Sequence, residues 1–279
     1  MAIGSIGLLH PGEMGAAVGG ELASAGHRVF WASRGRRPPS RHRAEAAGLV
    51  DVETIDALVQ ASDVIISLCP PHAALDVAKG VSPFRGIYLD ANAISPATAR
   101  QVADIVEHAG GEYVDGCIIG SPPTRDRAAR LYLAGKGGPT VLELFAGTSV
   151  QAAVVSSDPV AASALKMSYA AWSKGSAALL LAVRALAAAE GVLEPLLAAW
   201  QASELDLGLR SLQAGEWAAK KGWRWAGEMD EVAATFRSAG LPDGFHRAAA
   251  EMFARASSEA GVPADNAPSP PSSDAPLGR

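Results

Sequence analysis

The feature that most constrains the fold of this chain is an alternation, through its first half, of short β-type runs with alanine-rich helical stretches. The runs are rich in β-branched or aromatic residues and short enough for strands. We expect strands over residues 3–9, 27–32, 64–69, 86–91, 113–120, 131–134 and 150–155. We expect helices around 15–26, 41–47, 53–61, 72–80, 96–109 and 138–146. This alternation predicts right-handed crossovers and a mostly parallel, doubly wound α/β sheet.

The second half has a different pattern. From about Ala161 the β-type runs disappear and apolar residues recur at helical spacing, with further periodic segments near 193–206, 228–239 and 244–259. We therefore expect a doubly wound domain over residues 1–157 and an all-α C-terminal domain over 158–262. Residues 263–279 are rich in Pro, Ser and Asp, which predicts a disordered tail.

Composition limits the classes of function. The chain has 279 residues, of which 49% are apolar, so a sizeable core is available. Its net charge of −5 argues against generalised binding to nucleic acid or acidic membranes. No apolar run reaches the roughly 20 residues that span a bilayer, and we expect a cytoplasmic protein. Cys69 and Cys117 lie in apolar runs without a metal-ligand pattern, so buried thiols are expected.

A glycine-containing turn, GLLHPGEMG at residues 7–15, joins the first run to the first helix. In dinucleotide-binding folds, glycines at this point let the backbone approach the pyrophosphate, which sits on the free N–H groups of the helix. The spacing from Gly7 to Gly12 is longer than in GxGxxG, so a glycine turn without a ligand remains an alternative. On the ligand-binding interpretation, the candidate cofactor residues of the turn are His10, Pro11, Gly12, Glu13 and Met14.

The end of the second run carries a basic cluster, WASRGRRPPSRHR, without a carboxylate before Glu45. A free ribose 2′-hydroxyl usually meets Asp or Glu here, whereas a 2′-phosphate meets Arg and a hydroxyl. Ser33 and Arg34 therefore favour NADP over NAD. A solvated basic loop and a nucleic-acid contact are the alternatives.

Five segments occur in the order found in the β-hydroxyacid dehydrogenase family, which this chain resembles over residues 3–260. They are GEMG at 12–15, DVIISLCPP at 63–71, DANAISP at 90–96, VDGCIIGSPP at 114–123 and ALKMSYAAWSKG at 164–175. That family includes 3-hydroxyisobutyrate dehydrogenases and has imine reductases as relatives. The resemblance implies a Rossmann domain, a long interdomain helix, an α-helical C-terminal domain, and commonly a homodimer in which helices of both subunits close the active site.

Several residues acquire roles from this resemblance. Lys166 matches the family's catalytic lysine, which holds the substrate oxygen and passes a proton while hydride moves to or from the nicotinamide. Taken alone, Lys166 is equally consistent with a lysine whose stem lies along an apolar helix face. Cys69, Pro70 and Asn92 are assigned to the cofactor, and Ser95 with Pro96 predicts a helix start.

The chain also departs from the family. Ala170 replaces the family's asparagine, so Tyr169 and Ser173 on the same helix face are candidates for a substituting hydroxyl. Ile119 replaces a serine of the substrate-anchoring segment and leaves Gly120 and Ser121 as candidates. Further along, Met229 stands in place of a lysine, while Asp230 remains. These changes suggest a larger or less charged small-molecule substrate.

Three hypotheses follow. The first is an NADP-dependent oxidoreductase that interconverts a hydroxyl and a carbonyl with Lys166 as proton donor or acceptor. The second is an NADPH-dependent imine reductase, although relatives of that type generally lack the lysine. The third is an NADP-binding regulator that has lost turnover.

Overall fold

The structure is a computed structural model, and it describes residues 4–202 and 206–259. Its contacts divide the chain into two compact units. The first unit contains residues 1–170 and 234–242, and the second contains 171–233 and 243–279. The tail expected over 263–279 lies outside the described residues, and the domain boundary expected after residue 157 remains a prediction.

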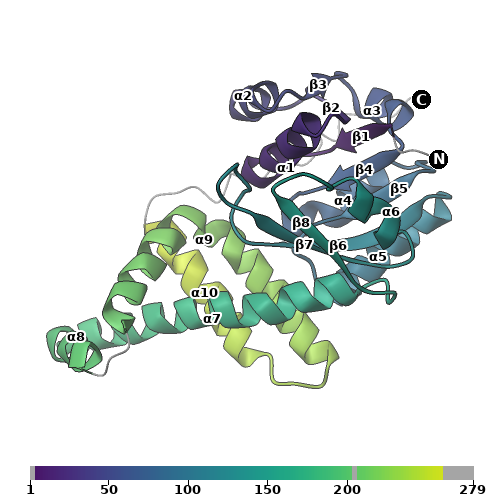
Figure 1. Cartoon of the computed structure of the whole chain (residues 1–279). Coiled ribbons are helices and arrows are strands. Elements are labelled where there is room, and N and C mark those ends of the chain that lie inside the picture. Colours follow the sequence, from purple (N-terminus) through teal and green to yellow (C-terminus); the bar gives the residue numbers. More distant parts are fainter. Residues whose placement is uncertain (1–3, 203–205, 260–279) are drawn as a thin grey trace, which may run out of the picture. The chain divides into compact units, whose positions relative to one another are not determined.

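The first unit is built on an eight-stranded sheet with the order β3-β2-β1-β4-β5-β6-β7-β8 (Figure 1). Neighbouring strands are parallel except for β6 and β7, which are antiparallel. The order reverses between β1 and β4, which is the point where ligands bind in doubly wound folds. The strands are β1 (Ser5–Leu8), β2 (Arg28–Trp31), β3 (Val50–Asp51), β4 (Val64–Ser67), β5 (Ile87–Asp90), β6 (Glu112–Ile119), β7 (Ala129–Ala134) and β8 (Val150–Ser156).

Helices cover both faces of this sheet. Side chains of α1 (Glu13–Ser24), α2 (Pro38–Ala46) and α6 (Gly138–Glu143) join one apolar cluster with Ile6 and Leu8 of β1. Side chains of α3 (Ile55–Ala61), α4 (Ala74–Gly80) and α5 (Pro96–His108) join a second cluster with Ile65 of β4. The two clusters follow from the strand period of two, because neighbouring residues of a strand point to opposite faces. The fold is therefore the Rossmann architecture that the alternation predicts.

Local signals define the helix starts of this unit. The hydroxyl of Ser95 accepts a hydrogen bond from the Thr98 N–H at 3.2 Å, and Pro96 is the first residue of α5. Both features match the expected start signal, since proline lacks the N–H that would stay unpaired in the first turn. A short 3₁₀ turn, η1 (Pro71–Ala73), separates β4 from α4.

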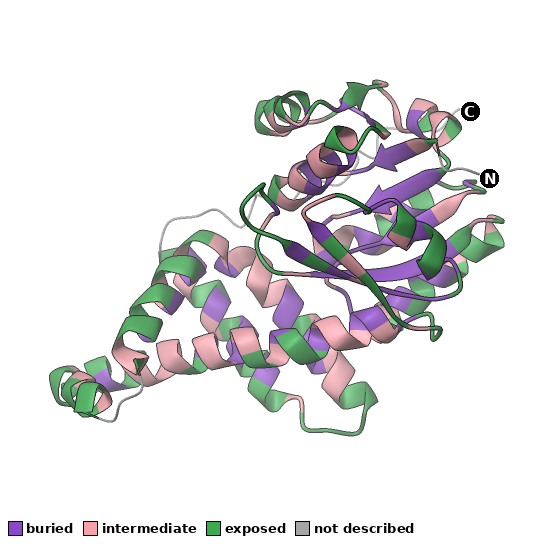
Figure 2. Cartoon of the chain, viewed as in Figure 1, coloured by how far each residue is buried: buried purple, intermediate pink, exposed green. Residues whose placement is uncertain are grey.

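The described part of the second unit is helical. It comprises the C-terminal part of α7 (Ala161–Ala189), α8 (Leu193–Ala202), most of α9 (Leu207–Ser238) and α10 (Gly244–Glu259). Helices α9 and α10 approach closely, because a Cβ at Gly222 would lie 2.7 Å from the carbonyl oxygen of Phe253. Trp225 and Phe253 pack edge to face with ring centroids 5.2 Å apart. Helix α8 has no buried residue (Figure 2).

Two elements differ from the sequence-based prediction. Strand β3 was not expected, because two exposed residues are too short to form an alternating pattern. Helix α9 begins at Leu207, about twenty residues before the segment expected at 228–239. Its early buried positions are the small residues Ser211, Ala214, Ala218 and Gly222, which give a weak hydrophobic signal.

Candidate functional site

The glycine turn lies at the carboxyl end of β1, beside the reversal of strand order. Gly7 belongs to β1 itself, where a side chain would overlap Ser62 and Leu58. A side chain at Gly15 would overlap the carbonyl oxygen of His10, so the tight turn requires glycine there. By contrast, no atom lies within 4 Å of the position of a Cβ at Gly12. The fold therefore uses Gly7 and Gly15 for packing, whereas Gly12 leaves open space.

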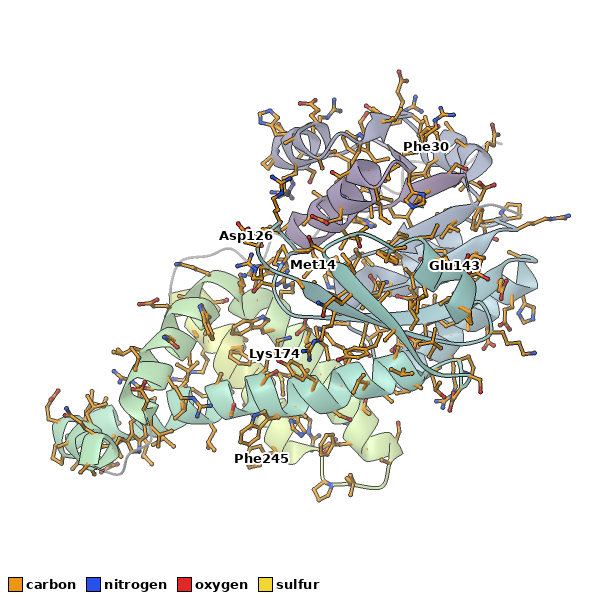
Figure 3. All side chains as sticks on the ribbon, in the orientation of Figure 1. Met14, Phe30, Asp126, Glu143, Lys174 and Phe245 are labelled. Atoms are coloured by element: carbon orange, nitrogen blue, oxygen red, sulfur yellow. The ribbon has the colours of Figure 1, made fainter. Side chains whose placement is uncertain are left out.

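Gly12 is also the cap residue of α1, and no side chain caps the helix start. Such an N-terminus offers N–H donors and a positive dipole end to an anion. Glu13 is exposed, Pro11 is buried, and Met14 at the start of α1 packs against the first apolar cluster (Figure 3). The arrangement around Gly12 is therefore suited to a phosphate-bearing ligand.

His10 is a partly buried base next to this helix start, and its Nδ1 atom is shielded from solvent. Its Nδ1 atom has no hydrogen-bond partner within the described ranges. Burial, with a contribution from the positive charge of Arg36, lowers the pKa of His10 to about 3. The imidazole is therefore neutral at physiological pH and can donate or accept a single hydrogen bond at each nitrogen.

Three arginines hold loop carbonyls. Arg36 Nη2 donates to Leu9 O at 2.9 Å, Arg41 Nη2 donates to Ser33 O at 3.2 Å, and Arg43 Nε donates to Pro11 O at 3.2 Å. The bonds of Arg36 and Arg43 connect the segment after β2 to the glycine turn, and the bond of Arg41 lies within that segment. Sequence reasoning treated the arginines as one cluster, but several of them have structural contacts.

The predicted 2′-phosphate residues lie in the same segment. The Ser33 N–H donates to Asp51 Oδ1 at 3.2 Å, and the Arg34 N–H donates to Glu53 O at 2.8 Å. Ser33 is buried, whereas Arg34 is exposed. The side chain of Arg34 is thus accessible to a ligand from solvent.

The ends of β4 and β5 are joined by Asn92. Its Oδ1 accepts from the Cys69 N–H at 2.6 Å, and its Nδ2 donates to Ser67 Oγ at 3.0 Å. Cys69 is a buried free thiol, as the sequence predicts, and burial raises its pKa to about 12. Pro70 follows and is partly buried. Cys69, Pro70 and Asn92 therefore form one connected group at this edge of the sheet.

Lys166 lies near the start of α7. Its Nζ donates to Ile118 O of β6 at 2.7 Å. Asp115 of the same strand accepts from the N–H and from the hydroxyl of Ser163, each at 2.7 Å. These bonds connect the first turn of α7 to β6 and so orient Lys166 one turn later.

Three candidate substrate residues, Gly120, Ser121 and Tyr169, lie close in sequence to Ile118 and Lys166. Gly120 follows β6 with φ of +121°, in the region that favours glycine, and Ser121 is exposed. Tyr169 is 48% exposed, whereas Ala170 is buried.

The remaining substrate candidates, Ser173 and Asp230, belong to the second unit. Ser173 is half-buried and Asp230 is exposed. Partial burial, with the neighbouring Glu231, raises the pKa of Asp230. The predicted site residues are thus divided between the two units.

The second unit contains an ion pair that sequence reasoning missed. Lys174 of α7 pairs with Glu228 of α9, and its Nζ lies 5.9 Å from the centroid of the Trp225 ring (Figure 3). Both charged side chains are largely buried, at 16% and 9% exposure. The available signal was Lys174, which lies on an otherwise apolar helix face with Ala170, Ala171 and Ala178.

Within residues 4–202 and 206–259, no three His, Cys, Asp or Glu side chains are grouped so that they could hold a metal ion. Among the helices described there, none is both long and apolar enough to cross a membrane.

The fold and this set of residues define a class. A family model described as the NAD binding domain of 6-phosphogluconate dehydrogenase matches residues 2–143, about half of the chain. The chain belongs to this family, whose fold is that of NAD(P)-dependent dehydrogenases and reductases. A second model, described as a domain of unknown function (DUF1932), matches residues 187–256. The resemblance to the β-hydroxyacid dehydrogenases is thereby confirmed.

Two curated relatives match part of the chain. An uncharacterized 28.5 kDa protein of Methanothermus fervidus is 32% identical over 165 residues, which are 59% of this chain and 63% of that protein. The mitochondrial 3-hydroxyisobutyrate dehydrogenase of Drosophila melanogaster is 28% identical over 139 residues, which are 47% of this chain and 41% of that protein. These matches span less than two thirds of the relatives' own lengths.

Solved structures match nearly the whole chain. A conserved hypothetical protein of Sinorhizobium meliloti is 26% identical with a TM-score of 0.68, covering 92% of this chain and 89% of that one. A reductive aminase of Aspergillus terreus, solved with NADPH4, cyclohexanone and allyl amine, is 20% identical with a TM-score of 0.56, covering 93% of this chain and 95% of that one. The second likeness concerns the fold alone.

Proposed function

We propose that this protein is a cytoplasmic NADP-dependent oxidoreductase that interconverts a hydroxyl and a carbonyl in a small-molecule substrate. The observation that carries the proposal is the hydrogen bond from Lys166 Nζ to Ile118 O, which holds an ammonium group at the end of a central strand. When bound, the nicotinamide supplies or accepts the hydride. Lys166 then donates or accepts the proton at the substrate oxygen.

The residues that would hold the cofactor follow from the open space at Gly12 and the uncapped start of α1. There, His10, Pro11, Gly12, Glu13 and Met14 form the diphosphate turn. Ser33 and Arg34 bind the 2′-phosphate, because a guanidinium forms charge-assisted, paired hydrogen bonds to phosphate. Cys69, Pro70 and Asn92 border the nicotinamide half. Each of these assignments is a proposal that substitution tests.

The substrate contacts are also proposals. Gly120 and Ser121 follow the strand that carries Ile118, and Tyr169 lies three residues after Lys166 on the same helix. Ser173 and Asp230 complete the proposed set. The same proposal includes the domain boundaries. Residues 1–157 form the cofactor domain, and residues 158–262 form the domain for substrate binding and dimerisation.

The first test is a fluorescence titration with NADPH and NADH, made on the wild type and on Arg34→Ala. We expect tighter binding of NADPH than of NADH in the wild type, and a loss of about tenfold or more in NADPH affinity in the variant, because one charge-assisted contact is removed. Arg85→Ala is the control for loss of a surface arginine. Equal affinity of the wild type for both nucleotides would contradict the NADP assignment.

Imine reduction is the second candidate function. Ala170 and Ile119 remove the amide and hydroxyl that the family resemblance assigns to small-acid substrates. A carbonyl and an imine panel, each with NADPH, separates the two reactions. Turnover of imines alone would favour the second candidate, and NADPH binding without turnover on either panel would favour a regulator.

A further inference from the structure

A buried row of polar side chains crosses the sheet of the first unit. Ser67 of β4 is paired in register with Asp90 of β5, and Asp90 is paired with Asp115 of β6. All three residues are at most 1% exposed. Register partners in a parallel sheet point to the same face, so these three side chains lie in one row beneath the helices. Ser67 and Asp90 are the last residues of β4 and β5, near the edge where the cofactor is proposed to bind, whereas β6 continues beyond Asp115.

Asp90 is connected to the segment after β4 through one residue. Its Oδ1 accepts from the Asn92 N–H at 3.0 Å. The side chain of Asn92 in turn binds the Cys69 N–H at 2.6 Å and the Ser67 hydroxyl at 3.0 Å. The carboxyl group of Asp90 is therefore two hydrogen bonds away from the backbone of Cys69.

The second oxygen of Asp90 is less well satisfied. Asp90 Oδ2 is buried and has no hydrogen-bond partner among the residues that the structure describes. A buried ionised carboxylate with an unsatisfied oxygen is costly, so this group is poised to take up a proton.

The surroundings of Asp90 strengthen this tendency. Asp115 faces it from β6, and burial together with the Asp115 charge raises the pKa of Asp90 to about 7. Burial raises the pKa of Asp115 to about 6, although its bonds to Ser163 oppose that shift. Asp158 also faces Asp115 from the segment before α7.

The other facing groups stay neutral. Tyr88 lies on β5, Tyr113 on β6 and Cys69 after β4, and burial raises the pKa of each. The positive charge of Arg36, from the segment after β2, opposes the shift in the pKa of Cys69. Asp90 and Asp115 are therefore the groups of this cluster whose charges change close to neutral pH, and Asp90 is the one that accepts from the Asn92 N–H.

We propose that Asp90 is a positioning residue that acts through Asn92 on the backbone of Cys69 and Pro70, so that its ionisation controls how firmly this segment is held against the cofactor. The link to the cofactor rests on the proposed function. The link to the backbone of Cys69 does not.

The direction follows from hydrogen-bond strength. An ionised carboxylate is a stronger acceptor for the Asn92 N–H than a protonated one. Above neutral pH the Asp90–Asn92–Cys69 connection is tight, and it loosens as the pH falls through the titration of Asp90. We expect NADPH affinity to fall about fivefold between pH 8 and pH 6, because a hydrogen bond to an ionised acceptor is roughly twice as strong as one to a neutral acceptor.

Two measurements test the proposal. The first is hydrogen exchange of the Cys69 amide by NMR between pH 6 and pH 8, without nucleotide and corrected for intrinsic exchange. The second is an NADPH titration over the same range. The wild type is compared with Asp90→Asn, which keeps the shape and an acceptor oxygen but does not ionise, and with Asn92→Ala, which interrupts the connection.

The matched control is Asp115→Asn, which removes a buried carboxyl bound to Ser163 rather than to Asn92. Comparison at each pH also cancels the titration of the NADPH 2′-phosphate. As the pH falls, we expect protection of the Cys69 amide to decrease in the wild type and, around a lower midpoint, in Asp115→Asn, because removal of the Asp115 charge lowers the pKa of Asp90. We expect no such decrease in Asp90→Asn and Asn92→Ala. NADPH affinity should likewise depend on pH in the wild type and in Asp115→Asn, and lose that dependence in Asp90→Asn and Asn92→Ala.

The outcomes are distinct. Cys69 protection that is independent of pH in the wild type overturns the proposal without reference to any variant. Protection that depends on pH in Asp90→Asn as strongly as in the wild type also overturns it. If Cys69 protection behaves as expected but NADPH does not bind at any pH, the positioning role of Asp90 stands and the proposed function fails.

Discussion

Lys166 is the residue whose substitution tests the proposed chemistry most directly. In Lys166→Met the proton donor is lost, while the two hydrogen bonds from Ser163 of α7 to the Asp115 carboxylate of β6 remain. We expect turnover of any substrate found on the carbonyl panel to fall about 10²- to 10⁴-fold, with NADPH affinity changed less than about twofold. Steady-state kinetics and nucleotide titration measure the two quantities.

The control for this substitution is Lys79→Met, which removes a lysine that forms an exposed pair with Asp76 at 3.5 Å. It should retain full turnover, because exposed pairs contribute little. Retention of turnover within about threefold in Lys166→Met would remove Lys166 from the proposed mechanism.

His10 predicts a specific pH dependence of stability. Its folded-state pKa of about 3 lies below the ordinary value of 6.5, so the folded protein binds fewer protons than the unfolded chain between these values. The contribution of neutral His10 is therefore complete above about pH 6.5 and is lost as the pH falls. Buried Asp90 has the opposite sign, since its raised pKa makes its contribution decline as the pH rises toward 7.

Comparison with His10→Asn isolates the histidine. From pH 7 to pH 4.5 we expect the wild type to lose about 2 kcal/mol more unfolding free energy than the variant, as measured by urea denaturation at each pH. The carboxylates contribute equally to both proteins and cancel. Parallel pH profiles would show that His10 has the same pKa in the folded and unfolded states and would contradict the expected lowering.

At the scale of elements, two glycines of the turn between β1 and α1 are expected to have different roles, Gly15 in folding and Gly12 in cofactor binding. Gly12→Val adds a side chain to open space at the cap of α1, whereas Gly15→Val places one against the His10 carbonyl. We expect Gly12→Val to unfold within a few degrees of the wild type but to lose NADPH affinity about tenfold or more, because the side chain occupies the proposed diphosphate position. Gly15→Val should lower the unfolding temperature strongly.

Thermal unfolding and nucleotide titration of the two variants check this division. Unchanged NADPH affinity in Gly12→Val would move the diphosphate elsewhere. The position of Gly7 explains why the sequence motif was ambiguous. Gly7 lies inside β1 and packs against α3, so Gly12 and Gly15 are the glycines of the turn itself.

At the scale of the whole molecule, the second unit has an exposed row of large apolar side chains on α7. Trp172, Leu179 and Leu186 are spaced seven residues apart on α7 and are 71%, 49% and 63% exposed. A seven-residue spacing keeps side chains on one helix face. This surface, together with α8, supports the proposal of a homodimer, since large exposed apolar patches mark association sites.

Light scattering tests the dimer. We expect a particle of twice the 28.6 kDa chain mass for the wild type and a shift toward monomer in Leu186→Glu. Glu190→Ala, an exposed change near the end of the same helix, is the control. A monomeric wild type at micromolar concentration would contradict the proposal.

Much of the fold was predictable because its signals are local. Strand and helix periods, the Ser95–Pro96 helix start and the glycine turn each depend on a few neighbouring residues. Strand β3 and the first part of α9 escaped prediction for a physical reason. A two-residue strand has no period, and the small buried residues of α9 carry little hydrophobicity.

The sequence by itself determined the Rossmann alternation, the helical second half and the residue types at the candidate site, since these follow from periodicity and local chemistry. Only the tertiary structure decided which arginines bind loop carbonyls and that the side chain of Arg34 is exposed. It also decided that Asp90 and Asp115, 25 positions apart in sequence, share one buried row. Charge state and hydrogen bonding depend on burial and on partners brought together by strand pairing, and neither can be read from neighbouring residues alone.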